Sequence, residues 1–313
     1  MFRLQSSAHA FVGVALLISS SAAMAQGTFW DSEDAFLGAE RPADVPIVFA
    51  PGRLAEPGSF VMGRVAFSRD GREFYYTQGD SWESLGHAKI KLVRFVGDRW
   101  EKPVVINEQF VSPTLSMDGK TLYFRHGNMQ NLWQSQRTST GWSSPSPVIQ
   151  GDLGVYDFMP TELGRFYVGS DPQPADAGYG ATYVFSRLAF TPAGPRASSL
   201  GQPLNTRGFN GDFFIARDES YMIVSTNETP DYESELYISF RKPDDTWTVP
   251  TSLGPAINNG RAHRWGQLVT ADGKFLFYSH GTSEKDCAVY WARFDRLLSK
   301  LRRVSAASPS GRR

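Results

Sequence analysis

The hydrophobic pattern of the chain consists of short β-type runs that come in pairs, with a turn between the two members of each pair. In the first pair the apolar run 65–67 precedes Ser-Arg-Asp-Gly at residues 68–71, and the aromatic run 73–76 follows it. Asp-Gly between two β-prone runs supplies the positive φ angles of a tight turn, so each pair predicts a β-hairpin. Four further copies, some of them degenerate, have their turns at residues 116–119, 161–164, 217–219 and 270–273.

Each hairpin is followed by a third alternating strand, such as residues 90–95, and usually by a fourth segment that contains proline, such as 100–106. Four strands per unit in a repeating array are typical of a propeller blade. The fifth unit lacks its fourth strand, and residues 45–52 at the other end resemble the missing one. The pattern therefore predicts an all-β, five-bladed β-propeller of four-stranded blades, closed by an N-terminal strand that completes the last blade.

The alternatives are a β-sandwich or two small β domains. Neither explains five similar copies or an unpaired strand at each end of the array.

The hairpin motif resembles repeats of a known family. Ser-Arg-Asp-Gly at residues 68–71 followed by Phe74 is similar to the WD40-like (PD40) repeats of TolB-like propellers. The segments 36–38 and 48–52 near the start and 289–292 near the end resemble the ends of a family of exported bacterial proteins built only from such repeats. The resemblance covers about residues 36–300 and implies the propeller fold; a fold of this kind does not imply one function.

The first 25 residues predict a signal peptide, because an apolar run at 11–18 precedes small residues that end in Ala23-Met24-Ala25. A membrane anchor is the alternative, but the run is too short to span a bilayer. We therefore expect an exported protein, periplasmic or secreted, with a lead-in segment at 26–44, a single propeller at 45–300 and a disordered basic tail at 301–313. After residue 293 a short helical pattern is expected.

Composition gives no indication of a charged partner, because Lys plus Arg and Asp plus Glu both number 32. No basic cluster suggests nucleic acid, and no later segment predicts a membrane span. Cys287 is the only cysteine, and its apolar surroundings predict a buried structural thiol. We expect a monomer that binds an unknown protein, peptide or glycan.

Candidate site residues are those expected on the face where the loops between blades and the loops from second to third strands emerge, since function collects on loops held by a rigid frame. The ends of the second strands include residues 77–80, 125–128 and 279–282. From these ends and from the starts of the blades, the predicted ligand-binding residues are Arg64, His126, Asp157, Asp212, His263, Arg264, Trp265 and His280.

Three chemistries are possible for this set. The histidines with Asp157 and Asp212 could hold a metal, but no His-x-x-x-His spacing occurs, and we predict neither metal nor cofactor. Asp157 and Asp212 could act as the acid and base of a glycoside hydrolase or lyase, or could instead pair with Arg64 or Arg264. Trp82 and Trp265 could stack on sugars.

Because no catalytic motif stands out, a binding module is predicted, with a carbohydrate-active enzyme as the alternative. Convergence of the three histidines with Asp157 and Asp212 would favour the enzyme.

Overall fold

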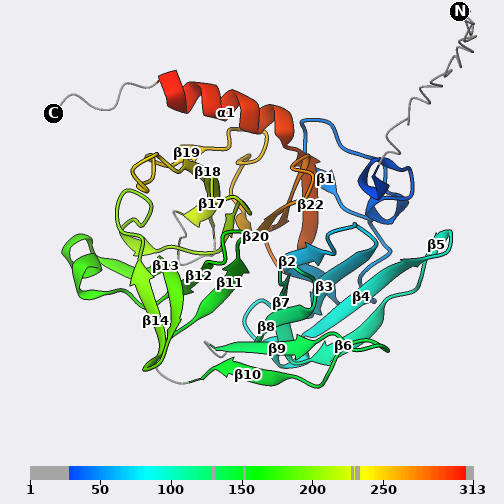
Figure 1. Ribbon diagram of the computed structural model, residues 1–313. Coiled ribbons are helices and arrows are strands. Elements are labelled where there is room, and N and C mark those ends of the chain that lie inside the picture. Colours follow the sequence, from blue (N-terminus) through cyan, green and yellow to red (C-terminus); the bar gives the residue numbers. More distant parts are fainter. Residues whose placement is uncertain (1–27, 128–130, 151–152, 227–228, 230–232, 308–313) are drawn as a thin grey trace, which may run out of the picture.

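The computed structural model describes residues 28–127, 131–150, 153–226, 229 and 233–307. The predicted signal peptide, 1–25, lies outside the described residues. Five mainly antiparallel sheets are arranged in a ring, and the innermost strand of each lies nearest the centre (Figure 1). The prediction of an all-β, five-bladed propeller is confirmed.

The blades are numbered in chain order, and the strands of each blade are named from the innermost outwards. Blade 1 contains β2 (Phe60–Phe67), β3 (Glu73–Gly79), β4 (Lys89–Val96), the short β5 (Arg99–Trp100) and β6 (Val104–Glu108). Blade 2 contains β7 (Phe110–Leu115), β8 (Thr121–His126), β9 (Leu132–Gln136) and β10 (Ser146–Ile149). Blade 3 contains β11 (Tyr156–Pro160), β12 (Phe166–Ser170), β13 (Ala181–Thr191) and β14 (Gly194–Ser199), and β15 (Gly208–Phe209) pairs with β13.

Blade 4 contains β16 (Phe213–Ile215), β17 (Tyr221–Thr226), β18 (Glu235–Phe240) and β19 (Thr251–Ser252). Blade 5 contains β20 (His263–Val269), β21 (Phe275–Gly281), β22 (Ala288–Arg293) and, from the other end of the chain, β1 (Ile47–Val48). The short 3-10 helices are η1 (Phe29–Asp31), η2 (Phe36–Gly38), η3 (Leu85–His87) and η4 (Pro174–Tyr179).

The ring is closed as predicted by strand β1, which pairs antiparallel with β22. Ile47 lies opposite Trp291 and Val48 lies opposite Tyr290. The backbone N–H of Phe49 then donates to the Val289 carbonyl oxygen at 2.8 Å. Closure gives the last blade its fourth strand and leaves less of an exposed sheet edge in blade 5.

The repeated turn motif has one hydrogen-bonding arrangement. In blade 1 the Ser68 hydroxyl lies 2.6 Å from Asp70 Oδ1 and accepts the Glu73 backbone N–H at 2.9 Å. Asp70 Oδ1 also accepts the Arg72 N–H at 3.2 Å, and Gly71 has φ +78°. The turns of blades 2 and 5 repeat these contacts with Ser116 and Asp118, and with Thr270 and Asp272. The motif recurs because its side chains satisfy the backbone of the turn.

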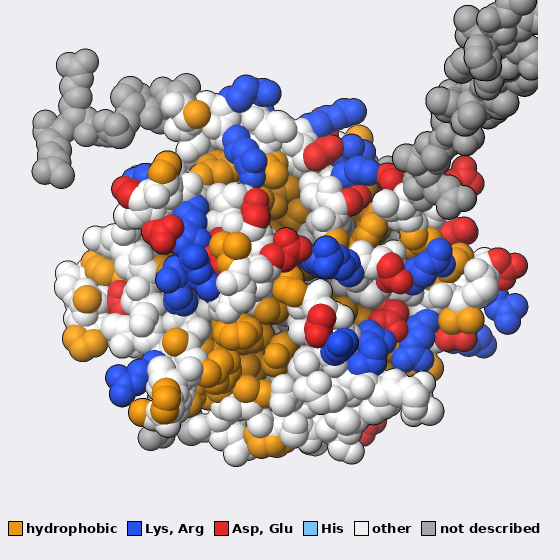
Figure 2. Space-filling model, viewed as in Figure 1, with side chains coloured by type: hydrophobic (Ala, Val, Ile, Leu, Met, Phe, Trp, Pro, Cys, Tyr) orange, Lys and Arg blue, Asp and Glu red, His pale blue; other side chains and the backbone are white. Residues whose placement is uncertain are grey.

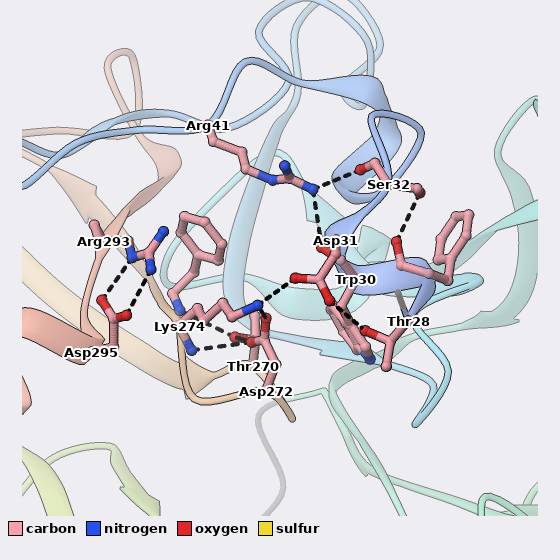
Figure 3. A network of polar contacts seen from close by, with 12 residues as sticks. Thr28, Trp30, Asp31, Ser32, Arg41, Thr270, Asp272, Lys274, Arg293 and Asp295 are labelled. Atoms are coloured by element: carbon pink, nitrogen blue, oxygen red, sulfur yellow. Dashed lines mark hydrogen bonds and ion pairs between the residues drawn. The ribbon is translucent and has the colours of Figure 1, made fainter. Parts of the chain in front are cut away.

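The lead-in segment is packed against the joint between blades 1 and 5. The Trp30 indole lies over Gly71, where an added Cβ would approach the ring to 3.0 Å, and its Nε1 donates to the Arg69 carbonyl oxygen at 3.0 Å. Asp31 forms an ion pair with Lys274, whose Nζ also lies 3.7 Å from Asp272 Oδ2 (Figure 3). The segment expected only as a lead-in is thus tied to the hairpin turns of both blades.

The helix expected after residue 293 is α1 (Asp295–Ala307), and it is longer than the sequence pattern indicated. Leu297, Leu298 and Leu301 pack on the hydrophobic core that includes blade 4, and Arg302 Nη2 lies 3.0 Å from the Ser220 hydroxyl. Residues 301–307, expected to belong to a disordered tail, are therefore helical, and Leu301 is the residue among them that is buried in this core. None of the described helices has the length and apolar character needed to cross a bilayer.

Both signs of charge are mixed on the face of the molecule drawn in Figure 2. Figure 2 shows hydrophobic side chains gathered toward the middle of the viewed face, with Lys, Arg, Asp and Glu side chains around them. This distribution agrees with the equal numbers of basic and acidic residues in the sequence.

Candidate functional site

The centre of the ring is shaped by a bulge near the start of the inner strands. The pairing register shifts at this point in β2, β7, β11 and β20. A residue with positive φ lies at each shift: Gly63 (67°), Ser112 (58°), Asp157 (50°) and Gly266 (65°). A bulge bends its strand and redirects the next side chain.

Two of the bulges touch across the joint of blades 1 and 5. A Cβ added to Gly266 would lie 2.3 Å from the Gly63 carbonyl carbon and 2.5 Å from the Arg64 nitrogen. Glycine is required at residue 266 both by the positive φ and by this backbone contact.

An ion pair fills the middle of the channel. Arg64, 1% exposed, places Nη2 2.9 Å from Asp157 Oδ2 and also donates to the carbonyl oxygens of Phe158, at 3.4 Å, and Phe213. The guanidinium of blade 1 is thereby bound to blades 3 and 4. It separates a cavity on the loop face from a smaller, mainly apolar one of about 50 Å³ on the hairpin-turn face.

The cavity on the loop face, the mouth pocket, has a volume of about 310 Å³. All five blades or the loops between them contribute to its wall, which is rich in aromatic side chains. Its lining residues are Met62, Gly63, Thr77, Trp82, Leu85, Val111, Ser112, Arg125, Tyr156, Tyr183, Phe209, Asp212, His263 and Trp265.

One side of the mouth pocket consists of stacked aromatic rings. The His263 imidazole lies parallel to the Trp265 indole with centroids 3.9 Å apart, and the Trp82 ring meets both edge-on at 5.5 and 5.6 Å. Burial lowers the pKa of His263 to about 3. The imidazole is therefore neutral at pH 7 and contributes an apolar face.

The opposite side carries the charged and hydroxyl groups. The Arg125 guanidinium lies 4.3 Å from the Tyr156 ring centroid and donates through Nη1 to the Gly127 carbonyl oxygen at 2.9 Å. Tyr183 meets Tyr156 edge-on at 5.7 Å and stacks on Phe209 at 5.0 Å. Burial raises the pKa of Tyr183 well above its usual value, so its hydroxyl remains a proton donor.

Asp212 also lines the mouth pocket. Its Oδ2 accepts the Gly266 backbone N–H at 2.8 Å, and its backbone carbonyl accepts from the Gln267 side chain at 3.3 Å. The carboxylate thus connects the first residues of blade 4 to the bulge of blade 5.

The structure brings some of the predicted site residues together. Asp212, His263 and Trp265 line the mouth pocket, as does Trp82, which the sequence suggested for stacking. Arg64 and Asp157 form the ion pair below it, one of the pairings considered from the sequence.

Other predicted residues lie outside the pocket lining. His126 packs against Phe110 in blade 2 at 4.9 Å, and His280 packs against Tyr290 in blade 5 at 4.8 Å. The Arg264 guanidinium donates to five backbone carbonyl oxygens, those of Ser234, Ile257, Asn259, Gly260 and Ala262. It therefore holds together the connection between blades 4 and 5.

Several lining residues were not selected from the sequence. Arg125 adjoins His126 at the end of a second strand, and adjacent residues of a strand point to opposite faces. The sequence predicts that this strand end lies on the loop face, but it does not give the register that distinguishes Arg125 from His126. Tyr156, Tyr183 and Phe209 are aromatic residues of the kind found throughout the core. No sequence signal distinguishes them from core residues.

The histidines and acids do not converge. Among the residues that the structure describes, no group of three or more His, Cys, Asp or Glu side chains could hold a metal ion. Cys287 is buried, and burial raises the pKa of its thiol to about 12. Asp157 is held by Arg64, whereas Asp212 binds a backbone amide.

The chain is similar in fold to several solved structures. No family model matches the chain. No curated protein sequence matches it either. TolB from Acinetobacter baumannii is 15% identical with a TM-score of 0.42, over 73% of this chain and 53% of that one, so the chain spans about half of the TolB length.

Two enzymes are among the other similar structures. A virginiamycin B lyase from Staphylococcus aureus is 11% identical with a TM-score of 0.39, over 79% of this chain and 97% of the lyase. A carbohydrate-active enzyme of family AA12 from Trichoderma reesei is 9% identical with a TM-score of 0.43, over 81% and 98%. At identities of this size the similarities concern the fold alone.

Proposed function

We propose that this chain is a binding protein whose ligand, a small molecule or the end of a larger one, occupies the mouth pocket. The observation that carries the proposal is the pocket itself: about 310 Å³, walled by aromatic side chains, with a few polar groups. This is the composition of small-molecule sites, whose volumes begin at about 300 Å³. The predicted signal peptide would place such a protein in the periplasm or outside the cell.

Binding is preferred to glycoside hydrolysis because of the two acids that hydrolysis would use. A hydrolase needs one carboxyl group as acid and another as base or nucleophile, both facing the scissile bond. Asp157 is ion-paired to Arg64 below the pocket, and its side chain is 2% exposed. Asp212 alone of the two reaches the lining.

A thermal-shift screen tests the proposal, since a ligand that binds only the folded state raises the melting temperature. The screen would contain small carboxylates, amines, alcohols, sugars and short peptides. We expect ligands that stabilise the wild type and lose this effect in Trp82→Ala, which removes one wall of the pocket. Trp142→Ala is the matched control, because Trp142 packs in blade 2 outside the pocket.

Hits that stabilise Trp82→Ala as strongly as the wild type would contradict the proposal, and so would a screen without hits. Hits that are lost in both tryptophan variants would indicate a general loss of stability rather than a pocket.

A further inference from the structure

The mouth pocket contains a buried arginine, Arg125, that has no acidic partner among the described residues. Arg125 is 9% exposed, and none of the ion pairs among the described residues includes it. By contrast, Arg64 is paired with Asp157, and Arg241, with an 11% exposed side chain, is paired with Glu219. Arg264 is satisfied by five carbonyl oxygens. In the part of the chain described, Arg125 donates a hydrogen bond to one carbonyl oxygen, that of Gly127, and its Nε is buried without a partner.

A second unsatisfied donor lies in the same wall. The Tyr183 hydroxyl is buried, the residue is 3% exposed, and no described residue accepts its proton. Tyr156 connects the two groups, because Arg125 covers its ring at 4.3 Å and Tyr183 meets it edge-on at 5.7 Å. Both donors therefore belong to one region of the lining.

Unsatisfied buried donors are costly, and a buried cation more so than a hydroxyl. A ligand oxygen with negative charge would satisfy both groups. The guanidinium is planar and matches a carboxylate through two parallel hydrogen bonds. A neutral sugar or alcohol would leave the charge of Arg125 uncompensated.

The rest of the lining limits the ligand further. Asp212 is the other charged residue of the lining, and its negative charge disfavours a ligand with two negative charges, such as phosphate. Trp82, His263 and Trp265 supply a continuous aromatic surface on the other side. One anionic group and one compact apolar body therefore fit the pocket.

Resting on the proposed function, we infer that the ligand is a small monocarboxylate with a ring or branched apolar body, bound with its carboxylate at Arg125 and Tyr183. The body contacts Trp82, His263 and Trp265.

Two matched series of compounds test this inference by isothermal titration calorimetry. The first is 3-phenylpropionate, 3-phenylpropan-1-ol and 2-phenylethylamine, and the second is 4-methylpentanoate and 4-methylpentan-1-ol. In each series we expect the carboxylate to bind at least tenfold more tightly than its neutral or cationic partner, because a hydrogen bond to a charged group contributes about tenfold to hundredfold in affinity.

Arg125→Gln should weaken carboxylate binding by about tenfold or more and leave the binding of the alcohols unchanged. Arg187→Gln is the matched control. Arg187 also lies over a tyrosine ring, that of Tyr167 at 5.8 Å, and its Nε is buried without a partner among the described residues, but it does not line the mouth pocket. Circular dichroism of both variants would confirm that each is folded.

The outcomes separate this inference from the proposed function. Pocket binding of alcohols, amines or sugars with no preference for carboxylates would overturn the inference while the binding function stands. Carboxylate binding that Arg125→Gln leaves intact would also overturn it. Absence of binding by every compound class, in calorimetry and in the thermal-shift screen, would overturn both.

Discussion

At the scale of single residues, three buried arginines show how differently one side chain can be used. Arg64 forms an ion pair across the channel, Arg264 binds backbone carbonyl oxygens, and Arg125 lines the pocket with one acceptor in the part of the chain that the structure describes. All three lie in strands: Arg64 in β2, Arg125 near the end of β8 and Arg264 near the start of β20. Their neighbours in space, which belong to other blades, decide between a structural and a binding role.

The neutral state of His263 leads to a prediction about acid stability. Its pKa is about 3 in the folded protein and near 6.5 when unfolded. Between these values the unfolded chain binds a proton that the folded chain does not, so the free energy of unfolding falls as the pH is lowered from about 6.5. In His263→Gln the free energy of unfolding should therefore fall less steeply with decreasing pH, by up to about 1.4 kcal/mol per pH unit. Urea unfolding at pH 6.5, 5.5 and 4.5 measures this difference.

His87→Gln is the control for this series, since the His87 side chain is 82% exposed. An unchanged pH dependence in His263→Gln would mean that the imidazole is not shielded from protonation.

The sequence predicted the face of the molecule on which the pocket opens, and it selected Asp212, His263 and Trp265, which line it. It selected Arg264 for the same reason, a polar residue at the start of a blade. The difference between these residues lies in the loop at 257–262, whose carbonyl oxygens turn toward Arg264. Such turning of a loop backbone leaves no trace in hydrophobic periodicity.

At the scale of elements, the hairpin turns explain both the repeat and its exceptions. Blade 4 has Glu219 where the other turns have glycine, and φ at this residue is still positive, at 59°. The Glu219 carboxylate is buried and accepts from Thr161, Tyr167 and Arg241. Burial acts to raise its pKa, but these hydrogen bonds and the charge of Arg165 outweigh it and hold the pKa below its usual value. A turn that looks degenerate in sequence therefore binds blade 4 to blade 3.

The bulges of the inner strands were not predicted, because a shift in pairing register does not change which residues are apolar. Gly63 and Gly266 are the sequence features that mark two of the bulges. They are a weak signal, because the chain contains 29 glycines.

Gly266→Ala should lower the free energy of unfolding by about 3 kcal/mol or more, since a positive φ and an overlap with the backbone of blade 1 each cost about 1–3 kcal/mol. Gly273→Ala is the matched control: φ is +72° there, but an added Cβ meets nothing within 4 Å. It should cost only about 1–2 kcal/mol. Chemical unfolding measures both, and equal effects would show that the backbones at residues 63 and 266 are not in contact.

At the scale of the whole molecule, the sequence predicted the number of blades and the closing strand. Closure could be predicted because the last repeat lacks its fourth strand, while an extra strand precedes the first repeat. The anchoring of residues 28–41 could not, since Trp30 and Phe36 pack against residues of blades 1 and 5 that are distant in sequence.

A disulfide between strands β1 and β22 would test closure. Val48 and Tyr290 lie directly opposite each other. Replacing both with cysteine, in a Cys287→Ala background, should give a cross-link that forms under mild oxidation. It should raise the free energy of unfolding by up to about 5 kcal/mol, because it closes a loop of most of the chain. Reduced samples and the single Val48→Cys variant serve as controls, and failure to cross-link in the folded protein would contradict the pairing.

The antiparallel pairing of β1 with β22 also determines how the ring responds to tension. Ile47 lies opposite Trp291, so the outward-leading ends of both strands emerge at the same end of the pair. Pulling on the two termini would release the lead-in and α1 and then break the β1–β22 hydrogen bonds one after another, as in unzipping, rather than all together in shear. The propeller would therefore open at blade 5 under a small force, with blades 1 to 4 still folded.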